Sequence, residues 1–141
     1  MHTMSDGECR AFLMEGTRTG HLATVGVDGR AHVAPVWFIL DGDDVIFTTA
    51  IRSAKGRNLA RQGRAGLSVD DAAPMYSFVH LEGPVVIDHD LGEMHRWTVQ
   101  ISARYMGVDR AEEYARRNAV ESECLVRLTP ETIVAEANLA E

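Results

Sequence analysis

The sequence lacks the features typical of disulfide-rich and membrane-spanning proteins. Its only cysteines, Cys9 and Cys124, have no CxxC spacing, which excludes a disulfide framework and a cysteine-rich zinc site and favours two buried thiols. The longest apolar run, Val33 to Leu40, is far shorter than the ~20 residues that cross a bilayer. The N-terminal residues contain no hydrophobic signal region. We therefore expect a cytoplasmic protein without a membrane segment.

Internal repeats and low-complexity linkers are also absent. The chain has 141 residues, of which 45% are hydrophobic and 25% are charged. These proportions are ordinary for a globular protein, and the length suits one compact core. We expect a single domain over residues 1–141.

Positive charge is scarce, but it is concentrated in one segment. The net charge of −7 argues against nucleic-acid binding, because counterion release requires a basic surface. No Asp or Glu occurs between Val45 and Val69, and this segment contains the only lysine, Lys55. The basic residues of the segment are Arg52, Lys55, Arg57, Arg61 and Arg64. A lone lysine in a chain that otherwise uses arginine indicates a specific role for Lys55.

Short apolar stretches separated by turn signals predict a β-rich chain. Asp28-Gly29 is typical of a hairpin turn, Pro35 indicates an edge strand or a bulge, and Gly83-Pro84 indicates a bulge or a switch between sheet faces. The predicted strands are 21–27, 31–40, 44–50, 65–70, 77–88, 124–128 and 132–137. Because no regular βα alternation appears, an antiparallel β-barrel with peripheral helices is favoured over a doubly wound sheet.

Helix-start signals precede the remaining segments. Ser5 with Glu8 and Asp90 with Glu93 form S/D-x-x-E patterns that predict capping boxes, and Ser53 can cap a third helix. The predicted helices are 6–15, 53–62, 90–106 and 110–119. The helices are therefore expected outside the β core.

The start of the helix at Ser53 is the clearest candidate site. Thr48, Thr49, Arg52 and Lys55 lie next to it in the sequence, and the free N–H groups and positive dipole of a helix N-terminus bind phosphate. A glycine in the first turn, Gly56, is explained if a ligand approaches the backbone closely. The alternative is a short solvated helix whose arginines face water.

Four motifs in order give a resemblance to a known family. They are GHLATVGVDGR (20–30), PVWF (35–38), VIFTTAIRSAKGRNLAR (45–61) and Glu82-Gly83. Together they resemble the pyridoxamine 5′-phosphate oxidase-like split β-barrel proteins, particularly the small deazaflavin-dependent branch. The resemblance covers nearly the whole chain, and it implies an antiparallel split β-barrel that forms a homodimer. Two flavin-type cofactors would then lie in grooves at the subunit interface.

The same resemblance implies which residues contact the cofactor. Lys55 and Ser53 would hold its phosphate, with Arg52 substituting where relatives have an arginine in place of Ser53. Val36 and Trp37 would lie beside the ring system, and Tyr76 and Phe78 would face the ring from the other subunit. The full set of expected cofactor-binding residues is Val36, Trp37, Thr48, Thr49, Arg52, Ser53, Lys55, Asn58, Tyr76 and Phe78.

The charge distribution favours one cofactor over another. FMN has a single phosphate, whereas coenzyme F420 has a phosphodiester, a carboxylate and a glutamate tail, which suit a wider basic surface. The acidic ending ETIVAEANLAE replaces the basic C-terminal region of true pyridoxamine phosphate oxidases, which argues against vitamin B6 oxidation. We expect hydride transfer between F420 and a small organic substrate.

Alternatives to this function remain open at this point. They are an FMN-dependent oxidoreductase of the same fold and a non-catalytic flavin or haem binder. No catalytic acid, base or nucleophile is indicated, because the cofactor itself supplies the redox chemistry. His89 and His95 lack metal-ligand spacing, so no metal site is expected. The roles of His80 and Arg104 are unassigned.

Overall fold

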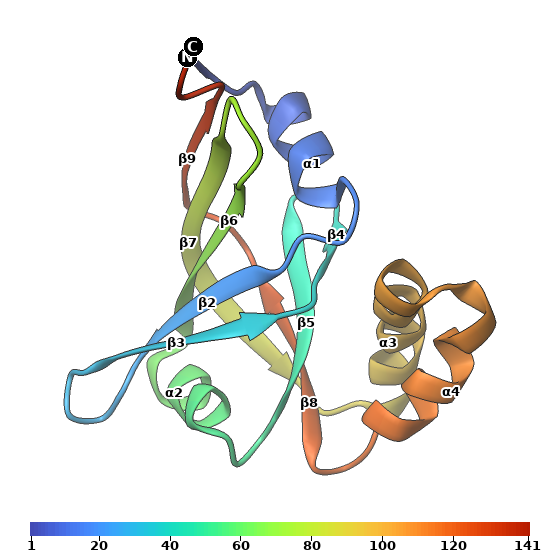
Figure 1. The fold of residues 1–141 in the computed structure, drawn as a ribbon. Helices are drawn as coiled ribbons and strands as arrows, with labels where there is room; N and C mark the ends of the chain where they lie inside the picture. Colours follow the sequence, from blue (N-terminus) through green and yellow to red (C-terminus); the bar gives the residue numbers. More distant parts are fainter.

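The computed structural model describes residues 1–141 and contains nine strands and four helices (Figure 1). The strands are β1 (His2–Thr3), β2 (Gly20–Val25), β3 (Ala31–Val36), β4 (Ile39–Asp41), β5 (Asp44–Ala50), β6 (Arg64–Asp71), β7 (Ser77–Asp88), β8 (Glu123–Leu128) and β9 (Thr132–Ala137). The helices are α1 (Asp6–Met14), α2 (Ala54–Gln62), α3 (Leu91–Met106) and α4 (Val108–Asn118). No helix is long and apolar enough to cross a membrane.

The strands form one curled, antiparallel half-barrel. Their order is β3-β2-β6-β7-β8-β5-β4, with β9 on β7 and β1 on β9. Residues 78–82 of β7 lie between β6 and β9, whereas residues 85–88 pair with β8. A Cβ at Gly83 would lie 2.0 Å from the Thr129 carbonyl oxygen, so glycine lets the β8–β9 connection cross β7 here. The predicted antiparallel β architecture and the switch at Gly83-Pro84 are confirmed.

Two apolar clusters hold the elements together. The larger contains 18 buried residues inside the curl of the sheet, among them Leu22, Phe38 and Phe47. The smaller joins Met94 and Trp97 of α3 to the outer side of β5 and β8. Cys9 and Cys124 are buried free thiols, as predicted. The helices α3 and α4 therefore stand as a separate layer beside the sheet (Figure 1).

The predicted strand over 31–40 is instead two strands. β3 ends at Val36 and β4 begins at Ile39, because α3 provides other partners for the two residues between them. The Phe38 N–H donates to the Tyr105 hydroxyl oxygen at 3.3 Å, and the Trp37 ring stacks on Tyr105 with 4.8 Å between ring centroids. Pro35 lies within β3, which is an edge strand, so the edge prediction is confirmed.

The two predicted capping boxes differ. At Ser5 both reciprocal hydrogen bonds with Glu8 are present. At the start of α3 the Asp90 carboxylate accepts the N–H groups of Gly92 and Glu93, but the Glu93 carboxylate accepts from Arg96 at 3.1 Å instead. The capping box predicted there is therefore an N-cap only.

Candidate functional site

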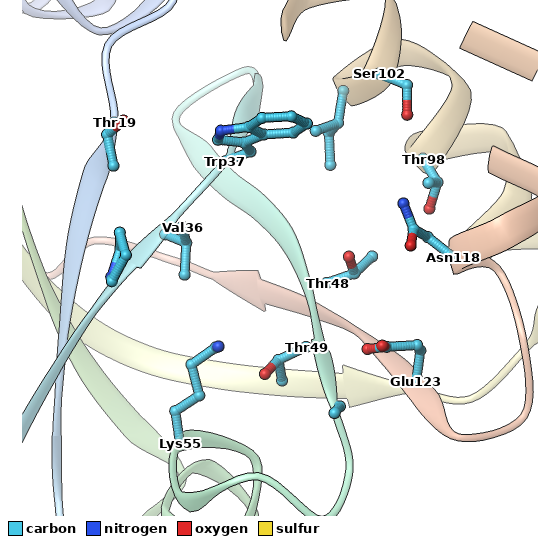
Figure 2. A pocket seen from close by; sticks show the side chains of 13 residues that line it. Thr19, Val36, Trp37, Thr48, Thr49, Lys55, Thr98, Ser102, Asn118 and Glu123 are labelled. Atoms are coloured by element: carbon cyan, nitrogen blue, oxygen red, sulfur yellow. The ribbon is translucent and has the colours of Figure 1, made fainter. Parts of the chain in front are cut away.

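A cavity of about 490 Å³ lies between the β3–β5 side of the sheet and the α3–α4 layer (Figure 2). Its volume is within the range of small-molecule and cofactor sites. Its lining residues are Thr19, Pro35, Val36, Trp37, Thr48, Thr49, Ala50, Lys55, Thr98, Ile101, Ser102, Asn118 and Glu123. The cavity therefore draws on segments from Thr19 to Glu123, which only the folded sheet brings together.

The fold brings one group of the predicted residues to this cavity, namely Val36, Trp37, Thr48, Thr49 and Lys55. Trp37 is 44% exposed. One face of its indole stacks on Tyr105 in a nearly parallel arrangement, 3° between the ring planes. Stacking fixes the indole in place, and the cavity thus has an aromatic wall at one end and the Lys55 ammonium at the other (Figure 2).

Arg104 and Tyr105 of α3 hold this aromatic wall in position. The Arg104 guanidinium donates to the carbonyl oxygens of Leu13 (2.8 Å), Gly16 (3.0 Å) and Phe38 (2.7 Å). The Tyr105 hydroxyl donates to the Arg18 carbonyl oxygen at 2.7 Å. Burial lowers the pKa of Arg104 and raises the pKa of Tyr105. Arg104, left unassigned by the sequence, joins α3 to α1 and to the connection between β3 and β4.

The start of α2 is built around the Ser53 hydroxyl. It accepts the Gly56 N–H at 3.0 Å, donates to the Ala50 carbonyl oxygen at 2.7 Å and lies 3.2 Å from the Thr49 hydroxyl. The first N–H bonded within the helix to a backbone carbonyl is that of Arg57, to Ser53. The N–H groups of Ala54 and Lys55 precede it, and they lie at the positive end of the helix dipole.

Glycine is required at position 56 for a different reason from the one expected. A Cβ there would lie 2.2 Å from the Ala50 carbonyl oxygen and 2.7 Å from the Ile51 carbonyl oxygen. The backbone that approaches Gly56 is therefore the chain's own, at the turn from β5 into α2. The explanation by a closely approaching ligand is wrong.

Glu123 is a cavity residue that the sequence reasoning missed. In the β5–β8 ladder it lies opposite Ala50, and its carboxyl points into the space that Lys55 also enters (Figure 2). Burial raises the pKa of Glu123, and the positive charge of Lys55 partly opposes this shift. No ion pair involves either side chain. Only the pairing of two distant strands reveals this residue.

Other predicted residues lie away from the cavity. Arg52 is exposed and faces a separate recess beside Ser122. Asn58 is buried, and its amide donates to the Thr24 hydroxyl at 3.1 Å. Tyr76 is exposed, and the Phe78 ring packs on His80 with 4.5 Å between centroids. A single chain therefore does not bring these residues to the cavity.

Two sets of comparisons relate this architecture to known proteins. The family model described as pyridoxamine 5′-phosphate oxidase matches residues 5–135. A solved structure of a conserved hypothetical protein from Mycobacterium tuberculosis has a TM-score of 0.82 and 28% identity, covering 94% of this chain and 84% of that one. An F420 reductase has a TM-score of 0.70 and 25% identity, covering 87% and 94%.

A third solved structure shares the fold at low sequence identity. The haem storage protein HutZ from Vibrio cholerae has a TM-score of 0.74 at 18% identity, covering 96% of this chain and 98% of that one, a likeness of fold alone. No curated protein matches the sequence significantly. The match over residues 5–135 and the shared split-barrel architecture establish that the chain belongs to the pyridoxamine 5′-phosphate oxidase family.

Proposed function

We propose that the cavity binds a flavin-type cofactor, with coenzyme F420 preferred over FMN, for hydride transfer to or from a small organic substrate. The observation that carries this proposal is the polarity of the cavity. Lys55 at the start of α2 provides a positive end, and Val36 with Trp37 provides an apolar, aromatic end. These two ends fit a cofactor with a phosphate at one end and a planar ring at the other. When bound, such a cofactor supplies the redox chemistry.

The chain's own residues would bind and orient the cofactor. The Lys55 ammonium and the N–H groups at the start of α2 provide charge-assisted donors for a phosphate. The stacked Trp37 indole, held by Tyr105, offers an apolar surface that excludes water from the ring. Thr48 of β5 and Thr98 and Ser102 of α3 also line the cavity and add hydroxyl groups to its wall (Figure 2). No lining side chain is required as an acid or a base.

The preference for F420 rests on a second basic surface. Arg57 and Arg61 of α2, together with Arg30 of the β2–β3 turn, line a separate cavity of about 350 Å³ beside His32. Because both cavities contact α2, an anionic tail that leaves the Lys55 end could continue along this helix. FMN has no second anionic group that would contact these arginines.

One chain by itself does not provide a haem ligand to the main cavity. The side chains that ligate haem iron are those of His, Cys, Met and Tyr. None of these residues from the same chain lines the cavity, so an axial haem ligand would have to come from the partner subunit.

We also propose that the chain acts as a homodimer. Residues Pro35, His21, Ser68, His80 and Val134 form one row across β3, β2, β6, β7 and β9. The outer face around this row carries exposed apolar side chains, including Val33 (64%) and Val134 (54%). An exposed apolar sheet face of this kind marks an interaction surface. A second copy on it would allow the partner's Tyr76 and Phe78 to reach the cofactor.

The test is a titration of the purified protein with F420 and with FMN, followed by absorbance and fluorescence, together with sedimentation velocity. The proposal predicts saturable binding of both, tighter for F420, by a dimer. Tight FMN binding without detectable F420 binding would mean that the cofactor is FMN, while the proposed site would stay the same. A folded monomer at micromolar concentration would refute the dimer.

A further inference from the structure

Lys55 and Glu123 place opposite charges in the same part of one cavity. Both line the cavity, and Figure 2 shows their charged ends on either side of Thr49, pointing into a common space. They form no ion pair with each other or with any other residue. The positive end of the cavity therefore has a negative group beside it, and both groups are free to act on a ligand.

The position of Glu123 is unfavourable for the charged form of its carboxyl group. It is partly buried and has no hydrogen-bond donor to compensate for the water it loses, which is why its pKa is raised. Substituting glutamine would keep its size and remove the negative charge. A partly buried carboxylate that lacks a hydrogen-bond donor and faces a ligand cavity is a candidate for direct interaction with the ligand.

The effect of this charge depends on the charge of the ligand. At pH 8 a phosphate monoester carries about two negative charges, because its second pKa is about 6, whereas a phosphodiester carries one. Repulsion from a nearby carboxylate grows with the ligand's charge. A cavity with Lys55 alone would favour the monoester, and a cavity with Lys55 and Glu123 penalises the second charge.

We propose that Glu123 is a specificity-determining residue that makes the Lys55 end of the cavity prefer a phosphodiester to a phosphate monoester. The inference rests on the proposed function, since it takes the Lys55 end as the phosphate site. It goes beyond that function by naming the group that discriminates between ligands, and it applies whichever ring the ligand carries.

The experiment uses ligand pairs that differ in this one charge. Each pair consists of a ring compound with a 5′-phosphate monoester and its methyl phosphodiester, prepared with both the flavin and the 5-deazaflavin ring. Dissociation constants are measured at pH 8 for the wild type and for Glu123→Gln. The matched control is Glu121→Gln, which removes the same charge from an exposed position in the separate recess beside Arg52.

The expected result is a change in preference, not in overall binding. Wild type and Glu121→Gln bind the diester at least as tightly as the monoester. Glu123→Gln tightens monoester binding about tenfold and changes diester binding by a smaller factor. Screening at high salt reduces the difference.

Three results would overturn the inference. An unchanged monoester-to-diester ratio in Glu123→Gln would show that the carboxylate does not sense the phosphate charge. Equal weakening of both ligands would make Glu123 a hydrogen-bond acceptor for the ligand instead. Failure of all four compounds to bind the wild type would refute the proposed function and this inference with it, whereas binding with an unchanged ratio would refute the inference alone.

Discussion

Two regions of this protein use cationic side chains in opposite ways. At the junction of α1 with α3, the Arg104 guanidinium donates to three backbone carbonyl oxygens and covers the Phe38 ring. At the start of α2, the Lys55 ammonium enters a cavity and makes no ion pair with the protein. The comparison indicates that Arg104 stabilises the fold, whereas Lys55 is available to bind a ligand. Arginine and lysine contribute equally to the net charge, so the net charge does not distinguish these roles.

The largest expected effect concerns the backbone that supports Lys55. Gly56→Ala should destabilise the protein by about 3 kcal/mol, because the added methyl group would clash with the Ala50 and Ile51 carbonyl oxygens. The free energy of unfolding is measured by urea denaturation. Gly7→Ala is the control, since Gly7 lies in α1 with nothing within 4 Å of an added Cβ; it should be neutral or stabilising. Equal stability of both variants would contradict the tight turn into α2.

The structural role of Arg104 predicts a somewhat smaller loss. Arg104→Ala should lower the free energy of unfolding by about 2 kcal/mol, because the Leu13 and Phe38 carbonyl oxygens would lose their donor. Arg96→Ala, on the exposed side of the same helix, should cost under about 1 kcal/mol. If Arg104→Ala weakened only cofactor binding and left urea denaturation unchanged, the contrast between the two regions would fail.

The raised pKa of Glu123 leads to a prediction about stability that can be tested without any ligand. Its pKa is raised in the folded protein, so the folded state binds the proton more tightly than the unfolded state, and this group's contribution to stability falls as pH rises above the unfolded pKa. Glu123→Gln should therefore raise the Tm at pH 8 and leave it nearly unchanged at pH 4. Thermal unfolding at both pH values measures this, with Glu121→Gln as the control. A lower Tm at pH 8 would mean that the carboxylate has a stabilising partner.

The smallest expected effect tests the second basic surface. The double variant Arg57→Gln/Arg61→Gln should weaken binding of long-tailed F420 by about three- to tenfold, because exposed ion pairs contribute under about 1 kcal/mol each. Binding of FMN or of a tail-less deazaflavin should change little, and raised salt should shrink the difference. Fluorescence titration measures all three ligands. Equal losses for every ligand would place the tail elsewhere.

Local signals were sufficient to predict most of the sheet. The Asp28-Gly29 turn and the switch at Gly83-Pro84 were visible because they depend on residues next to one another. The break after Val36 was not, because Tyr105, which takes the place of a strand partner for Phe38, lies 67 residues further along the chain. Local patterns predict elements, and they do not predict which distant side chain interrupts one.

The residues of the candidate site also divide into those that local sequence predicts and those that only long-range contacts bring together. Thr48, Thr49 and Lys55 were predicted as neighbours in one segment, and they do line one cavity. Glu123 joins them only through the β5–β8 register, and Thr98 and Ser102 only through the packing of α3. The sequence also misattributed Gly56, because a glycine required by a ligand and one required by the chain's own backbone look identical in sequence.

The measurement that tests the central claim most directly is F420 binding by Lys55→Ala, compared with wild type and with Lys55→Arg. If Lys55 holds the phosphate, the alanine variant should lose about 1.5–3 kcal/mol of binding free energy, the range for a hydrogen bond to a charged group. Unfolding should change little, because the side chain makes no hydrogen bond or ion pair and acts on Glu123 only through its charge. Lys55→Arg, which keeps the charge, should recover part of the affinity. An alanine variant that binds F420 as tightly as the wild type would contradict the account.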